Sequence, residues 1–132
     1  MEELEQRINS VLWQYRKVDT PIKMNLEARI STALRLPAIA AGNLFRIVQE
    51  AIQNAVMHSE AGNIDVLIDL QGNVLTVTVA DNGKGFSWPA PSAENHFGMS
   101  NMEKRANEMN AKLLVSTNGG QGTTLSVKLK VD

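Results

Sequence analysis

Apolar and polar positions follow two different periods along this chain, and each change of period marks a predicted helix or strand. From about residue 3 to residue 16, apolar residues recur every three or four positions, which predicts an amphipathic helix. Pro21 should separate this helix from the next element, because the residue before a proline avoids helical backbone angles. Ile22, Met24 and Leu26 then alternate with polar residues, which predicts a strand. The apolar positions of the first helix are Leu4, Ile8, Val11, Leu12 and Tyr15.

The strongest helical pattern lies in the middle of the chain. Pro37 can open a helix, since its fixed backbone angle suits the first turn, and the helix should end between residues 59 and 62. Between these limits one apolar stripe repeats with helical spacing, so one side of the helix should face a core. The stripe consists of Leu44, Ile47, Val48, Ala51, Ile52, Ala55 and Val56.

Two runs of alternating apolar residues come next, at residues 64–70 and 74–79. Gly72 and Asn73 form a typical tight turn between them, so the two runs should pair as a β-hairpin. A loop should then extend from Asp81 to Phe97, because this segment is rich first in glycine and proline and then in small polar residues.

The last third of the chain predicts a helix and a second pair of strands. The helix spans about residues 99–109, and Asn110 can cap its C-terminus because asparagine tolerates the left-handed conformation. Residues 112–117 and 123–131 alternate as strands do, on either side of a glycine-rich turn. Together the elements predict an α+β fold, a two-layer α/β sandwich with a mixed sheet on one side and about three helices on the other.

Composition and charge exclude several classes of function. The 132 residues include no cysteine, which excludes disulfides and thiolate metal sites. The formal net charge is -1, so the chain lacks the basic character typical of nucleic-acid binding. No apolar run is long enough to cross a bilayer, and the acidic start lacks the apolar core of a signal peptide. We therefore expect a single cytoplasmic domain over residues 1–132, with residues 1–19 as its N-terminal helix and no contact with nucleic acid or membrane.

The main helix carries polar residues that suit a metal ion. Glu50 and Asn54 lie one turn apart on the polar side of the stripe, and Arg46 and His58 extend the same row. A carboxylate and an amide oxygen at this spacing suit a hard cation such as Mg²⁺, with water and phosphate oxygens as the remaining ligands. From this helix alone, a solvated polar face is the simpler interpretation.

A second candidate cluster, Asp81 to Phe86, directly follows a predicted strand. An aspartate at a strand end can accept a hydrogen bond from an exocyclic amine. Gly83 and Gly85 would allow the backbone to pass close to a flat ligand. A plain turn explains the same residues, because Asn-Gly after an apolar run is a common turn signal.

Two further glycine positions could meet a nucleotide. Gly122 and Thr123 enter the last strand, where the threonine hydroxyl could bond near a base, although no lysine follows the glycines as in a P-loop. Gly98 stands at the start of a predicted helix, whose free amide groups favour phosphate. A hairpin turn and an ordinary helix cap are the alternative interpretations.

The order of these four clusters is more specific than any one of them. A helix with Glu and Asn, a hairpin, Asp-x-Gly-x-Gly, a glycine at a helix start and Gly-x-Gly-Thr before the last strand resemble the GHKL ATPase superfamily of gyrase, Hsp90, histidine kinases and MutL. The resemblance covers about Pro37 to Leu129. Within the superfamily, the chain is similar to histidine kinases of the nitrate and membrane-fluidity sensor branch. The residues that carry this similarity are LFRIVQEAIQNAVMHS at 44–59, then Gly98-Met99 and Met102-Glu103-Lys104-Arg105-Ala106.

The resemblance implies a role for each cluster. Glu50 would orient or activate the transfer, and Asn54 would ligate Mg²⁺. Asp81 would bind the adenine amino group, Thr123 would join the hydrogen bonds around adenine, and Gly98 would lie near the phosphates. Apolar walls for the base would come from Ile52, Val56, Phe86, Met102 and Leu125, unless these are simply core residues. The expected nucleotide-binding residues are Asn54, His58, Asp81, Gly83, Gly85, Phe86, Gly98, Met99, Met102, Gly122 and Thr123.

The implied fold is the Bergerat ATPase fold, and the implied reaction is phosphoryl transfer from MgATP to a histidine on a separate dimerisation domain of the same kinase. The expected cofactors are ATP and Mg²⁺, and the expected downstream partner of the full protein is a response regulator. A membrane-bound parent would carry its spans elsewhere. Two alternatives stay open: a GHKL serine kinase of the anti-sigma type, and a non-catalytic module that binds nucleotide as a switch.

Three departures from the family pattern bear on this function. Met57 stands where many relatives have lysine. His96 stands where many have a glycine two positions before Gly98, and the lid at residues 87–97 is short.

His58 and His96 are the only histidines, and neither lies in a context typical of a phospho-accepting helix. We therefore expect the chain to lack its own acceptor.

Overall fold

The computed structural model describes residues 2–17, 22–30, 36–58, 62–83, 97–118 and 122–131, which form three helices and five strands. The sequence predicted all of these elements, and α3 begins two residues earlier than expected. In chain order they are α1 (Glu2–Lys17), β1 (Lys23–Arg29), α2 (Ala38–His58), β2 (Asn63–Gln71), β3 (Val74–Asp81), α3 (Phe97–Glu108), β4 (Lys112–Asn118) and β5 (Gly122–Lys130).

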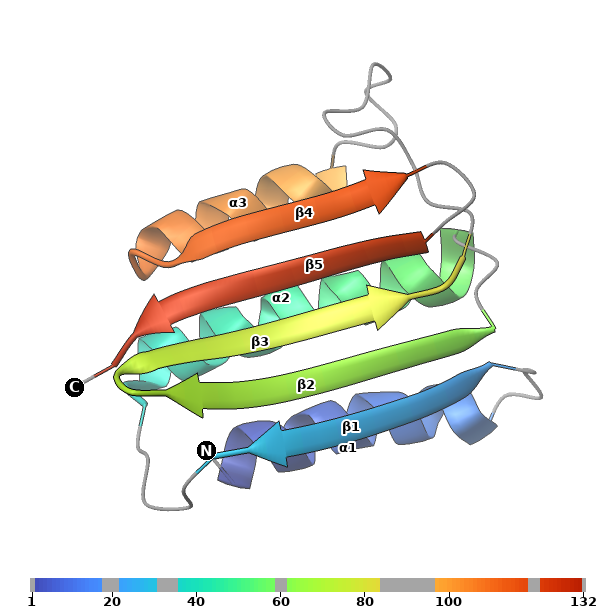
Figure 1. The fold of residues 1–132 in the computed structure, drawn as a ribbon, viewed down its shortest axis with the longest axis horizontal. Helices are drawn as coiled ribbons and strands as arrows, with labels where there is room; N and C mark the ends of the chain where they lie inside the picture. Colours follow the sequence, from blue (N-terminus) through green and yellow to red (C-terminus); the bar gives the residue numbers. More distant parts are fainter. Residues whose placement is uncertain are drawn as a thin grey trace.

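The strands form one mixed sheet in the order β1-β2-β3-β5-β4 (Figure 1). β1 pairs parallel to β2, and every other neighbouring pair is antiparallel. A parallel pair needs a crossover connection, and α2 supplies it between β1 and β2. Gly72, with a φ of 61°, lies in the tight turn between β2 and β3, as the hairpin pattern predicted.

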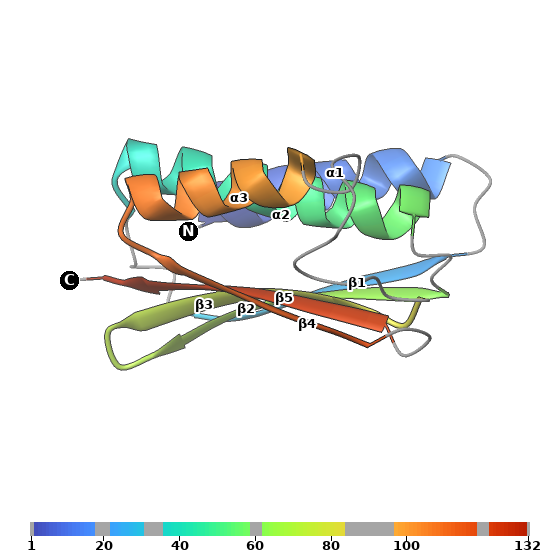
Figure 2. The same ribbon diagram turned by 90° about the horizontal axis from the view of Figure 1, so that it is seen from above.

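The helices cover one face of the sheet, so the described chain has two layers (Figure 2). Alternate residues of each central strand point into the space between the layers, which explains the period of two in the sequence. In β3 these residues are Leu75, Val77 and Val79, and none is more than 4% exposed. The predicted stripe on α2 faces them and is buried along its length, with Val56 partly buried. This arrangement is the predicted two-layer α/β sandwich.

Helix α1 is part of the same core. Ile8 and Leu12 are 0% exposed, and Leu4 and Val11 are also buried. At the contact with α2, the guanidinium carbon of Arg7 lies 4.1 Å from the ring centre of Phe45, a favourable cation–π arrangement. None of the described helices is long and apolar enough to span a bilayer.

Helix α3 ends at the cap that the sequence predicted. Asn110 has a φ of 54°, in the left-handed region. The amide of Ala111 donates to the carbonyl of Ala106 at 2.8 Å. The amide of Asn110 donates to the carbonyl of Asn107 at 3.2 Å. These two bonds define a Schellman motif, with asparagine in the place that glycine usually takes. The motif satisfies the carbonyl groups of Ala106 and Asn107 and is followed directly by β4.

Candidate functional site

The end of β3 and the start of β5 bring together two predicted site residues. Asp81 is the last residue of β3, and its partner across the antiparallel ladder is Thr123. Both residues continue the inward-facing positions of their strands, so both side chains point toward the helix layer. Thr123 is 9% exposed and Asp81 is half-buried. The two form a polar pair at one end of the sheet face that packs against the helices.

Two predicted glycines allow the backbone to approach Asp81 closely. The amide of Gly83 donates to Oδ1 of Asp81 at 2.8 Å, so the following loop holds one oxygen of the carboxylate, while Oδ2 can accept from a ligand. Gly122 has a φ of 90°, and a Cβ at this position would collide with the carbonyl oxygen of Asp81 and lie 3.1 Å from Cα of Asn82. Only glycine satisfies both the conformation and the space. Asp81, Gly83 and Gly122 therefore belong to one constellation.

Glu50 and Asn54 lie on the flank of α2 that faces α3. Asn43 identifies this flank, because its Oδ1 accepts a hydrogen bond from Nη1 of Arg105 on α3 at 3.4 Å. Glu50 and Asn54 follow Asn43 by two and three helical turns, intervals that return to nearly the same side of an α-helix. Both side chains are half-buried, which argues against a fully solvated face.

The N-terminus of α3 lies alongside the same flank. Helices α2 and α3 contact each other and run antiparallel (Figure 2). Phe97 precedes Arg105 by about 12 Å of helix, at 1.5 Å per residue. This distance places the first turn of α3 at the level of Glu50 and Asn54. Gly98 is in that turn, whose backbone amides have no partners within the helix and can meet an anion.

Of the apolar residues expected around a base, Ile52, Met102 and Leu125 are core residues in this structure. Ile52 and Met102 are 0% exposed, Met99 is 2% exposed and Leu125 is 4% exposed. Val56 is half-buried. Their burial follows from packing between the two layers, so their contact with a ligand stays a prediction.

Several predicted residues lie outside the part of the chain that the structure describes. These are Gly85, Phe86 and His96, with the rest of the lid up to residue 96. His58 is the last residue of α2, and only its backbone is described. Met57, where relatives often have lysine, is 64% exposed.

Asn82, inside the candidate cluster from Asp81 to Phe86, was expected only to form part of a plain turn. Its Oδ1 accepts hydrogen bonds from the backbone amides of both Gly62 and Asn63, each at 2.8 Å. An asparagine next to a glycine predicts a local turn. It does not predict a bond to a segment about twenty residues earlier, and no other signal in the sequence would have found it.

Asn54 fits the predicted Mg²⁺ role only in combination with waters and a phosphate ligand. The described residues contain no group of three or more His, Cys, Asp or Glu side chains that could hold a metal ion. Mg²⁺ is usually bound by one or two protein oxygens, with waters and substrate phosphates completing the octahedron. The amide oxygen of Asn54 would supply one such protein ligand, and the carboxylate of Glu50 belongs to the same flank of α2.

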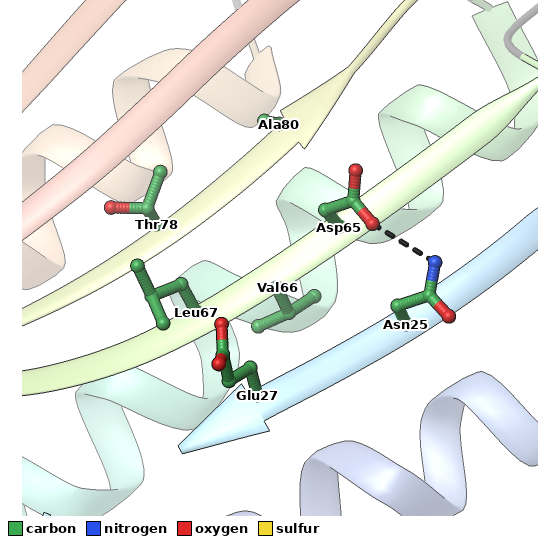
Figure 3. Close-up of a pocket in the computed structure, with 7 residues that line it drawn as sticks. All are labelled: Asn25, Glu27, Asp65, Val66, Leu67, Thr78 and Ala80. Atoms are coloured by element: carbon green, nitrogen blue, oxygen red, sulfur yellow. Dashed lines mark hydrogen bonds between the residues drawn. The ribbon is translucent and has the colours of Figure 1, made fainter. Parts of the chain in front are cut away.

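A shallow depression lies elsewhere, on the face of the sheet opposite the helices (Figure 3). Within it, Nδ2 of Asn25 donates to Oδ1 of Asp65 at 3.0 Å. None of its residues was predicted to be functional, and it is separate from the constellation around Asp81. The residues that line it are Asn25, Glu27, Asp65, Val66, Leu67, Thr78 and Ala80.

Residues 40–132 match the family described as histidine kinase-, DNA gyrase B-, and HSP90-like ATPase. Over 97 residues the chain is 36% identical to the signal transduction histidine-protein kinase/phosphatase DegS of Brevibacillus brevis, covering 74% of this chain and 25% of DegS. It is 37% identical over 89 residues to the sensor histidine kinase LiaS of Bacillus subtilis, covering 67% and 24% of the two chains. The chain thus spans about a quarter of the length of these two relatives.

Solved structures share the fold. The histidine kinase domain of the blue-light activated histidine kinase from Erythrobacter litoralis EL346 superposes with a TM-score of 0.79 at 20% identity, over 97% of this chain and 59% of that one. The catalytic domain of histidine kinase ThkA gives a TM-score of 0.76 at 17% identity, over 96% of this chain and 91% of that one. At these identities the likeness concerns the fold.

Proposed function

The chain belongs to the family of histidine kinase-, DNA gyrase B- and HSP90-like ATPases, and on this premise we propose that it is the ATP-binding catalytic domain of a sensor histidine kinase. It transfers the γ-phosphoryl group of ATP to a histidine on a separate dimerisation domain of the same kinase. From there the phosphoryl group passes to a response regulator. The domain works in the cytoplasm, and any membrane span belongs to other parts of the parent protein.

The observation that supports this proposal most directly is the position of two polar groups of residues at the same end of the two layers. Asp81 and Thr123 lie at the ends of paired strands and point to the helix layer. The flank of α2 with Glu50 and Asn54 leads toward the same end, where α3 also begins (Figure 1). An elongated ligand with an amine at one end and phosphates at the other suits this arrangement.

The mechanism assigns a task to each side chain. The carboxylate of Asp81 accepts a hydrogen bond from the exocyclic amine of adenine, and Thr123 contributes its hydroxyl beside it. Asn54 offers an amide oxygen to Mg²⁺, which would neutralise phosphate charge when bound with ATP. Glu50 orients the incoming histidine or accepts its proton. Phosphoryl transfer needs mainly positioning and charge stabilisation, so a few oriented groups are sufficient.

The acceptor must come from another domain. His58 is four residues after Asn54 at the end of the same helix, so its backbone cannot move toward a nucleophilic position without unwinding α2. The test is to incubate the chain with γ-labelled ATP, alone and with a dimeric histidine-bearing helical domain from a related kinase. We expect acid-labile label on the partner domain and none on the chain.

Three results would contradict this function. Acid-labile label on the chain alone would show that one of its own histidines is an acceptor. Label on neither protein, with firm ATP binding measured in parallel, would favour the non-catalytic nucleotide switch. Acid-stable label on a protein serine would favour the anti-sigma type of kinase.

A further inference from the structure

Asn82 connects the end of β3 to the start of β2 through three hydrogen bonds. Its side-chain oxygen accepts from the amides of Gly62 and Asn63 at 2.8 Å each, and its own amide donates to the carbonyl of Asn63 at 3.3 Å. Gly62 is in turn bonded to β1, because its carbonyl accepts from the amide of Lys23 at 2.9 Å. One exposed asparagine thus joins the end of β3 to the start of β2, which is itself bonded to the start of β1.

Asn82 lies between Asp81 and Gly83, the residue whose amide holds the Asp81 carboxylate. Asp81 is the last residue of its strand, where regular pairing ends and backbone structure tends to open. Its Oδ1 is held by the amide of Gly83, which directly follows Asn82. Gly122 packs against the Asp81–Asn82 peptide from β5. The peptide is therefore held by β5 and, through the Asn82 side chain, by the residues at the start of β2.

We propose that Asn82 is a positioning residue for adenine recognition, which acts by holding the Asp81–Gly83 segment so that the second carboxylate oxygen of Asp81 faces the adenine amine. This inference rests on the proposed nucleotide-binding function. Asn82 itself does not touch the ligand. Its contribution is the acceptor oxygen shared by two backbone amides, so aspartate, which also offers such an oxygen, should replace it and alanine should not.

The test compares ADP with inosine diphosphate, which carries a carbonyl oxygen where adenine carries the amine. Calorimetry on the full chain measures both affinities for the wild type and for Asn82→Ala, Asn82→Asp and Asp81→Asn. We expect the wild type to prefer ADP by roughly tenfold or more, since a carboxylate accepts from the amine and repels the carbonyl. Asn82→Ala and Asp81→Asn should both lose most of this preference, and Asn82→Asp should keep it.

Asn25→Ala is the matched control, because it removes a side-chain hydrogen bond of 3.0 Å between β1 and β2 on the opposite face of the sheet. It should leave the ratio of the two affinities unchanged, even where it lowers the melting temperature. If Asn82→Ala does not fold, Asn82→Ser replaces it, since a serine hydroxyl is too short to reach both amides.

An unchanged ADP preference in Asn82→Ala or Asn82→Ser would overturn the proposal and assign Asn82 to stability alone. Loss of preference in Asn82→Asp as complete as in Asn82→Ala would also overturn it. Both results leave ADP binding by the wild type intact, so the proposed function would stand. A wild type that binds neither nucleotide would instead overturn the proposed function, and this inference with it.

Discussion

Asp81 is the residue that recognises the adenine base in the proposed site. One carboxylate oxygen is held by the Gly83 amide, and the neighbouring Thr123 is almost fully buried. The backbone of Gly122 leaves no space for a Cβ beside the Asp81 carbonyl. The side chain therefore has little freedom, which suits a group that must distinguish an amine from a carbonyl oxygen.

We expect Asp81→Asn to weaken ADP binding by roughly 10- to 100-fold, because an amide NH₂ replaces a charged acceptor in front of the adenine amine. The asparagine oxygen can still accept from Gly83, so the fold should survive the change. Titration calorimetry at a temperature where both proteins are folded measures the effect. Equal ADP affinity in the two proteins would show that Asp81 does not contact the adenine.

Asn54 and Glu50 should affect different steps. Asn54→Ala should abolish the Mg²⁺ dependence of ATP binding, since the amide oxygen is the proposed protein ligand. Glu50→Gln should lower the rate of transfer to the partner domain more than it lowers ATP affinity, because its role is in the reaction. Nucleotide titrations with and without Mg²⁺, and a timed transfer assay, separate the two. Gln53→Ala, at an exposed position on α2, is the control. A Glu50→Gln protein with the full transfer rate would show that Glu50 has no role in the reaction.

At the level of elements, β5 and α2 each contain a glycine whose replacement by alanine tests the packing. The two replacements should change the stability in opposite directions. Gly122 begins β5 with a φ of 90° and packs against the backbone at the end of β3. Gly42 lies inside α2, and a Cβ there would meet nothing within 4 Å. The first glycine is required by geometry, and the second only adds flexibility to the unfolded chain and the helix.

Gly122→Ala should therefore lower the free energy of unfolding by about 1–3 kcal/mol or more, from the left-handed conformation and the collision with Asp81. Gly42→Ala should raise it by about 0.5–1 kcal/mol, because alanine favours a helix interior. Urea denaturation followed by circular dichroism measures both. Tolerance of alanine at position 122 without loss of stability would contradict the close approach of β5 and β3.

At the level of the whole molecule, α1 extends the core beyond the family match. The match begins at residue 40, yet Ile8 and Leu12 of α1 are 0% exposed and pack in the same hydrophobic cluster as the α2 stripe. The Arg7–Phe45 contact joins the two helices at the surface. We therefore expect α1 and the residues from 40 onward to unfold together.

Ile8→Ala tests this expectation. Removing a fully buried isoleucine side chain should cost about 2–5 kcal/mol of unfolding free energy. Asn9→Ala, at an exposed position of the same helix, should change stability by less than about 0.5 kcal/mol. Unfolding curves from far-ultraviolet circular dichroism and tryptophan fluorescence should coincide in both variants. A loss below about 0.5 kcal/mol for Ile8→Ala would show that α1 is not part of the cooperative unit.

The sequence by itself determined the secondary structure, the two-layer class and the family. Burial in a two-layer fold imposes a period of two on strands and of about 3.6 on helices, so the stripe on α2 and the inward residues of β3 are visible in the residue order alone. Local chemistry is equally visible: the Gly72-Asn73 turn and the Asn110 cap depend on the backbone preferences of single residues.

Only the tertiary structure decided which distant residues meet. The pairing of Asp81 with Thr123 follows from the strand order, in which β5 lies between β3 and β4. The orientation of Glu50 toward α3 follows from the hydrogen bond between Asn43 and Arg105 of α3. The bonds of Asn82 to the start of β2 have no signal in the neighbouring residues of the sequence. Periodicity records which side of an element is buried, whereas the identity of its neighbour depends on how segments far apart in the chain pack together.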